Sequence, residues 1–355
     1  MRTMWYSDNA TVDDTAPLTS VILAYSPTRY VRYAQDRLIE GLGDHAPITL
    51  YTPDESIIPE GYESCCHIRR YEGSAGSVGD CVRDIGFFHG DTFYVYKGFL
   101  DRSIDPDVSR YGDVPNAILD DMGKAGYGIE PIDYEGGCMI SDGEIILVPG
   151  KRPDHSLESR LGLETVPTGL PGYVHVDLFM NAIGKGRFLY NRGALSQDIV
   201  HDMISFKSYR DSMDGLAARL RDMGNVVEVA DSTVNERRNL EGLKGTPIYN
   251  QAVSRIPTLP VQANIISTGE NVLVLRDQAH GYLDELGTES IHDMLESFGL
   301  DVHEIDWRLD NLEPWSPSGC FWRLGERLAG PRCMTLPLRT RDAQLNCYRD
   351  YPPKE

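Results

Sequence analysis

Residues 133–150 have the sequence DYEGGCMISDGEIILVPG, which contains the unit that recurs along the chain. A carboxylate and two glycines precede a polar turn, and the apolar run IILV follows and stops at a proline and a glycine. An apolar run of this length between turn residues is typical of a buried β-strand. Similar runs, each ending near glycine, proline or a polar residue, lie at residues 20–26, 90–98, 186–191 and 270–277. Strands are therefore expected over the whole chain.

Helical patterns lie between these runs. Apolar residues at spacings of three and four give each predicted helix one apolar face. The predicted helices span residues 30–42, 212–223 and 289–298. No linker rich in proline or serine divides the chain, so we expect one α/β domain of repeated units over residues 18–345. Residues 1–17 are expected to form an N-terminal extension, and residues 346–355 a C-terminal tail.

Charge and hydropathy exclude several classes of partner. The chain of 355 residues has 34 Lys and Arg against 54 Asp and Glu, a formal net charge of −20. Such a surface repels phosphate backbones and anionic membranes, so we expect no nucleic acid and no membrane as partner. The sequence has no signal-peptide pattern and no run near the ~18 apolar residues of a membrane span. We therefore expect a cytoplasmic protein.

The cysteines do not form a recognisable framework. There are seven, an odd number; Cys65 and Cys66 are adjacent, and no CxxC pair is present. Neither a set of disulfides nor a zinc ribbon is indicated, and no group of residues has a recognisable spacing of metal ligands. Most of the cysteines are expected to be reduced core residues.

Four segments place ionisable side chains beside predicted strands, where loops would present them to one cavity. Asp84 lies in CVRDIGFFHGDTFYV, Glu135 in DYEGGCMISDGEIILV and Cys333 in GPRCMTLPLR. His175 and Asp177 lie in GYVHVDLFMN. Because residues two apart share a face of an extended strand, we expect these last two side chains to point to the same side.

Each segment alone favours a structural role: a salt bridge, a turn or a buried thiol. Their order along the chain carries the signal, because carboxylate, carboxylate-Gly-Gly, His-x-Asp and a late Cys follow one another. This order resembles the guanidine-modifying superfamily, which has the pentein fold and includes arginine deiminases, dimethylarginine hydrolases and amidinotransferases. The resemblance extends from about Leu18 to Arg339. It implies an α/β fold, a five-bladed propeller of ββαβ-type units around a central active site.

The resemblance also implies a role for each site residue. Asp84 and Glu135 would hold the guanidinium nitrogens, His175 would transfer protons, and Asp177 would orient His175 or bind the substrate. Cys333 would attack the guanidinium carbon. The chemical properties of these residues agree with such roles, because carboxylates can hold a planar cation in position next to a thiolate. We expect the reaction to need no cofactor and no metal.

Two cysteines and two arginines near these positions have roles of their own to consider. Cys81 and Cys138 lie beside Asp84 and Glu135, and we expect them to line the pocket rather than attack. Arg327 or Arg332 could meet a substrate carboxylate, since arginine offers a matching fork of donors. A structural salt bridge is an equal alternative for either arginine.

The sequence favours a deiminase-type hydrolase that acts on arginine or a related guanidine and releases ammonia or an amine. An amidinotransferase is the alternative, because HVDLFMNAIGKGRFLYN (residues 175–191) is similar to that group. Deiminases commonly have Asp or Asn after the two glycines, where Cys138 stands here, so the identity of the guanidine stays open. An inactive binding protein on the same fold is disfavoured, because each expected catalytic position holds a competent residue. Whether the chain forms a homo-oligomer also stays open.

Overall fold

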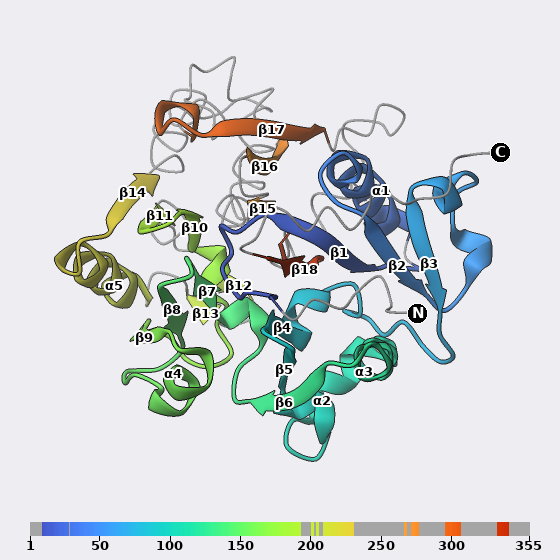
Figure 1. Cartoon of the computed structure of the whole chain (residues 1–355), viewed down its shortest axis with the longest axis horizontal. Helices are drawn as coiled ribbons and strands as arrows, with labels where there is room; N and C mark the ends of the chain where they lie inside the picture. The colour runs from blue at the N-terminus through green and yellow to red at the C-terminus, as the bar shows by residue number, and fades with distance from the viewer. Residues whose placement is uncertain are drawn as a thin grey trace.

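Five of the six β-sheets in the described part of the chain stand around a common centre (Figure 1). The computed structural model describes residues 9–27, 29–192, 200–201, 204–205, 209–230, 266–267, 271–276, 295–306 and 332–340. Arg327 and the predicted tail at 346–355 lie outside these residues.

The stretch quoted first forms one complete blade. β7 (Ile140–Ser141) and β8 (Ile145–Val148) pair antiparallel, α4 (His155–Leu161) follows, and β9 (Glu164–Pro167) returns parallel to β8. All four side chains of β8 are buried, as the apolar run predicts. The carboxylate of Asp154 caps α4 by accepting a bond from Leu157 N at 3.0 Å, and Gly162 ends the helix in the left-handed region.

An antiparallel strand pair with a third strand parallel to one of its members recurs in the other blades. One consists of β4 (Gly86–His89), β5 (Thr92–Tyr96), α2 (Lys97–Leu100), α3 (Val114–Ala125) and β6 (Gly128–Ile132). The next consists of β10 (Met180–Gly184), β11 (Arg187–Asn191), α5 (Arg210–Asp222) and β14 (Val226–Ala230). Another consists of β15 (Ile266–Ser267), β16 (Asn271–Arg276) and β17 (Asp301–Asp306). A separate short hairpin joins β12 (Val200–His201) and β13 (Ile204–Ser205).

The remaining blade closes the ring. It contains β1 (Leu18–Ala24), α1 (Arg29–Gly43), β2 (Ile48–Thr52), β3 (Cys66–Arg70) and the late strand β18 (Leu336–Arg339). β18 pairs antiparallel with β1, with Leu18 opposite Arg339 and Ile22 opposite Leu336. One sheet therefore joins the two ends of the domain and brings the late Cys333 back to the centre.

The five predicted strands are all confirmed. Each overlaps an inner strand of a blade: β1, β5, β8, β11 and β16. The helices predicted at 30–42 and 212–223 correspond to α1 and α5. Of the third, at 289–298, only residues 295–298 are described, and 295–297 are helical. None of the helices in the described residues is long and apolar enough to cross a membrane.

The segment before β1 packs against the centre of the ring. Ala10 forms β-bridges to Gly90 and Thr340, and Thr11 N donates to Arg339 O at 2.9 Å. Asp14, four residues before β1, is buried. Part of the predicted N-terminal extension therefore lies inside the fold.

Candidate active site

The candidate residues lie in, or directly before, tight turns that each precede the first strand of a blade. The turn η3 (Val82–Ile85) precedes β4, η5 (Gly136–Cys138) precedes β7, and η6 (Val176–Leu178) precedes β10. A fourth turn, closed by Thr335 N donating to Arg332 O at 3.2 Å, precedes β18. The turns contact one another, and Arg83 N donates to Cys333 O at 3.1 Å. Four blades thus bring Asp84, Glu135, His175, Asp177 and Cys333 together at the centre.

The predicted extended strand through His175 and Asp177 is wrong. His175 itself is extended, but residues 176–178 form the 3₁₀ turn η6, in which Phe179 N donates to Val176 O at 2.9 Å. β10 begins only at Met180. The alternation of apolar and polar residues favours a strand, and the local hydrogen bond of the turn overrides it.

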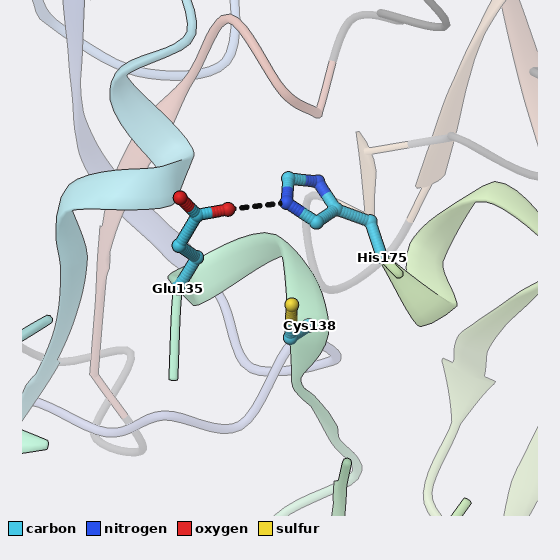
Figure 2. Close-up of side chains that lie close together, drawn as sticks. All are labelled: Glu135, Cys138 and His175. Carbon is cyan, nitrogen blue, oxygen red and sulfur yellow. Dashed lines mark hydrogen bonds and ion pairs between the residues drawn. The ribbon is translucent and has the colours of Figure 1, made fainter. Parts of the chain in front are cut away.

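His175 lies between two carboxylates. Its Nε2 is 2.7 Å from Glu135 Oε2 (Figure 2), and its Nδ1 is 3.6 Å from Asp84 Oδ1. Burial on its own would lower the pKa of His175, but the charge of Asp84 and the neighbouring thiols outweigh burial and raise it well above its usual value. These neighbours therefore favour the protonated, cationic form of the imidazole.

Asp84 is buried with one satisfied and one unsatisfied oxygen. Tyr111 Oη donates to Oδ2 at 2.6 Å, whereas Oδ1 accepts no hydrogen bond from the described residues. Burial raises the pKa of Asp84 to about 7; His175 opposes this rise, and the nearby Glu135 adds to it. The carboxyl group therefore needs a further donor to satisfy it when ionised.

Cys333 is buried beside His175. Burial and the charge of Asp177 raise the pKa of its thiol, while a hydrogen bond with His175 lowers it, and the net direction is upward. The thiols of Cys81 and Cys138 also lie near His175, and burial raises the pKa of both. The histidine thus has three thiols around it.

The two glycines after Glu135 are required by the closeness of the turns. A Cβ on Gly137 would lie 2.5 Å from His175 Nδ1 and 2.9 Å from Asp84 Oδ1. A Cβ on Gly136 would lie 2.1 Å from Arg83 O. Neither Gly136 nor Gly137 has a positive φ. Lack of space for a Cβ, rather than backbone conformation, therefore requires glycine at both positions.

Arg332 lies in a buried network of charges. Its guanidinium donates to Asp14 Oδ2 at 2.8 Å, Asn181 Oδ1 at 3.1 Å and Met139 O at 3.1 Å. Its Nε is 3.4 Å from Asp177 Oδ2. Of the two roles left open by the sequence, these contacts are those of a structural salt bridge.

Comparison with known proteins identifies the fold. No protein-family model matches the sequence, and no curated protein matches it. The structure is similar to an agmatine deiminase of C. jejuni, with a TM-score of 0.53, 12% identity, and coverage of 94% of this chain and 96% of that one. It is also similar to the agmatine deiminase of Enterococcus faecalis, with a TM-score of 0.54, 11% identity, and coverage of 94% and 97%. The chain has the pentein propeller fold.

The fold class predicted from the sequence is therefore confirmed, and the pentein arrangement explains why residues so far apart meet. Two contributors to the centre were missed. Tyr111 contacts Asp84 from 27 residues away, and Asp14 contacts Arg332 from 318 residues away. No local pattern marks either residue, because each partner lies far along the chain and is brought close only by the folding of the blade.

Proposed function

We propose that this chain is a guanidine-modifying hydrolase in which Cys333 attacks the carbon of a guanidinium group. One observation carries the proposal. Two buried carboxylates beside Cys333 and His175 have an oxygen that has neither a hydrogen bond nor a close ion pair with an arginine among the described residues: Oδ1 of Asp84 and Oδ1 of Asp177, whose Oδ2 lies 3.4 Å from Arg332 Nε. A buried acceptor left unpaired costs about 1–3 kcal/mol, so such oxygens favour a ligand rich in donors.

A guanidinium group suits these acceptors. It is planar and cationic, and its N–H groups form paired, charge-assisted hydrogen bonds with carboxylates. Asp84 would accept hydrogen bonds from the guanidinium nitrogens. Asp177, which also contacts Arg332, would accept further bonds from the same group. Fixing the carbon against the thiol in this way removes much of the entropic cost of the attack.

The remaining residues supply the proton transfers. Cys333 reacts as the thiolate, which the bound cation and the His175 imidazolium favour. Its sulfur adds to the guanidinium carbon, one C–N bond breaks, and His175 gives its proton to the departing ammonia or amine. Water then adds to the S-amidino carbon while His175 accepts its proton, and the C–S bond breaks to leave a ureido product and the free thiol. Glu135, 2.7 Å from Nε2, holds the ring in place throughout.

The amidinotransferase differs only in the second half of the reaction, where an amine replaces water. The similarity of residues 175–191 to that group supports it, whereas the two similar structures compared above are agmatine deiminases. Asn181, within this segment, accepts a bond from Arg332 and so has a structural contact of its own. We therefore place hydrolysis first.

The test is to incubate the protein with arginine, agmatine and methylated arginines, each with and without glycine or ornithine. Products are identified by mass spectrometry, and a Cys333→Ser protein serves as the matched control. We expect a ureido product and ammonia or an amine in the absence of any acceptor. A new guanidine formed only when an amine is present would favour the transferase, and no product from any guanidine would contradict both functions.

A further inference from the structure

Cys138 lies close to Glu135 and His175, so that the three side chains form a possible metal-binding group at the centre. One ligand atom each from Glu135, Cys138 and His175 lies within 4.8 Å of the others. Figure 2 shows the Glu135 carboxylate facing the His175 ring, with the Cys138 sulfur pointing toward the pair from the same turn as Glu135. The three donors are one thiol, one imidazole and one carboxylate.

This donor set fits a thiophilic divalent cation. Zinc binds thiolate, imidazole and carboxylate at about 2.0–2.3 Å, which puts two ligands of one tetrahedral ion about 3.3–3.6 Å apart. The Nε2–Oε2 contact of 2.7 Å would lengthen by less than 1 Å, and the sulfur already lies within 4.8 Å of the other two ligand atoms. Small side-chain rotations are enough, because Cys138 and Glu135 are fixed at the two ends of one turn.

Cys138 has no role in the proposed hydrolysis. It is fully buried, and its Sγ donates to the Gly172 carbonyl at 3.2 Å. Cys81, another buried thiol near the same histidine, does not belong to the group of three. The two cysteines therefore provide a matched comparison.

We propose that Glu135, Cys138 and His175 bind one zinc-like divalent cation, and that the bound ion inhibits the enzyme. Inhibition rests on the proposed function, because the ion would occupy the imidazole that transfers protons and the carboxylate that holds it. Three protein ligands leave a fourth position for water. Cys138 thereby becomes the residue that makes the site sensitive to the metal.

Cobalt(II) provides a test that needs no turnover. Full-length wild type, Cys138→Ser, Cys138→Ala, Cys333→Ser and Cys81→Ser proteins are titrated with Co²⁺, and absorption is recorded in the near ultraviolet and visible. We expect a thiolate-to-cobalt band and tetrahedral bands at one equivalent in the wild type, Cys81→Ser and Cys333→Ser proteins. Both Cys138 variants should lose the thiolate band, and Zn²⁺ should bind them at least about 100-fold more weakly.

Two further readouts separate the site from the reaction. Stoichiometric Zn²⁺ should raise the melting temperature of the wild type, since a ligand that binds the native state stabilises it. Zn²⁺ should inhibit turnover by the wild type and Cys81→Ser, with the inhibitory concentration at least about 100-fold higher for Cys138→Ser. Loss of the band in Cys333→Ser but not in Cys138→Ser, or no band and no thermal shift in the wild type, would overturn the proposal. A protein that binds the metal but turns over no guanidine would contradict the proposed function alone.

Discussion

Asp14 and Asp84 are both buried at the centre of the ring, each 3% exposed, yet their surroundings differ. Asp14 accepts a bond from Arg332 at 2.8 Å and one from Arg83 at 3.3 Å. Burial would raise the pKa of Asp14, but Arg332, Arg83 and Arg339 together lower it. Asp84 has no arginine partner among the described residues, and burial raises its pKa to about 7.

The difference shows what the centre lacks. Arg83 and Asp84 are neighbours in sequence, yet the arginine pairs with Asp14 and leaves Asp84 to Tyr111 and His175. Among the residues that the structure describes, arginines thus pair with Asp14 and none pairs with Asp84. We infer that the guanidinium of the substrate donates hydrogen bonds to Asp84, as the guanidinium groups of the arginines donate to Asp14.

The largest effect is expected from the nucleophile. Cys333→Ser should lower kcat at least about 10⁴-fold, because a serine hydroxyl ionises far less readily than a thiol. Substrate affinity, measured by equilibrium binding of the guanidine, should change little, since the carboxylates remain. Substantial turnover by this variant would show that another group attacks.

Asp84→Asn tests the comparison directly, with Asp14→Asn as its counterpart. Asp84→Asn should lower kcat/KM about 100-fold or more with a raised KM, because a neutral amide loses the charge-assisted bond. Its stability to urea should stay within about 1 kcal/mol of the wild type, since no arginine loses a partner. Asp14→Asn should instead cost about 3–5 kcal/mol of stability by leaving buried arginines partly unpaired. If the two variants gave the same pattern, the distinction between the carboxylates would fail.

Gly137→Ala tests the space between His175 and Asp84. The added Cβ would meet His175 Nδ1 at 2.5 Å, so the imidazole must move. A displacement of this order should lower kcat/KM about 100-fold. The control is Gly215→Ala in α5, where a Cβ meets nothing within 4 Å and activity should be retained. Equal activity of both variants would contradict the close approach of these turns in the working enzyme.

A pH profile gives the smallest predicted effect. Asp84 must be ionised to bind a cation, and its pKa of about 7 means that protonation removes the carboxylate as the pH falls below that value. The kcat/KM of the wild type should therefore fall about tenfold per pH unit on the acid side. A profile that stays flat from pH 8 to pH 5 would show that the charge of Asp84 is not needed.

The sequence predicted the propeller and the set of central residues better than their local geometry. The strands were found because runs such as IILV at 145–148 are short, apolar and bounded by turn residues. The conformation of His175 and Asp177 was missed, because a turn closed by one backbone bond leaves no periodic pattern. The role of Asp14 was missed because its partners depend on how the blades close into a ring.

The central claim is that Cys333, and no other cysteine, bonds to the guanidinium carbon. Quenching the wild type in acid during turnover, followed by peptide mapping with mass spectrometry, tests it most directly. We predict an adduct with the mass of the substrate less the departing ammonia or amine on the peptide that carries Cys333, and none on that peptide in Cys333→Ser. An adduct on Cys81 or Cys138 instead would contradict the account.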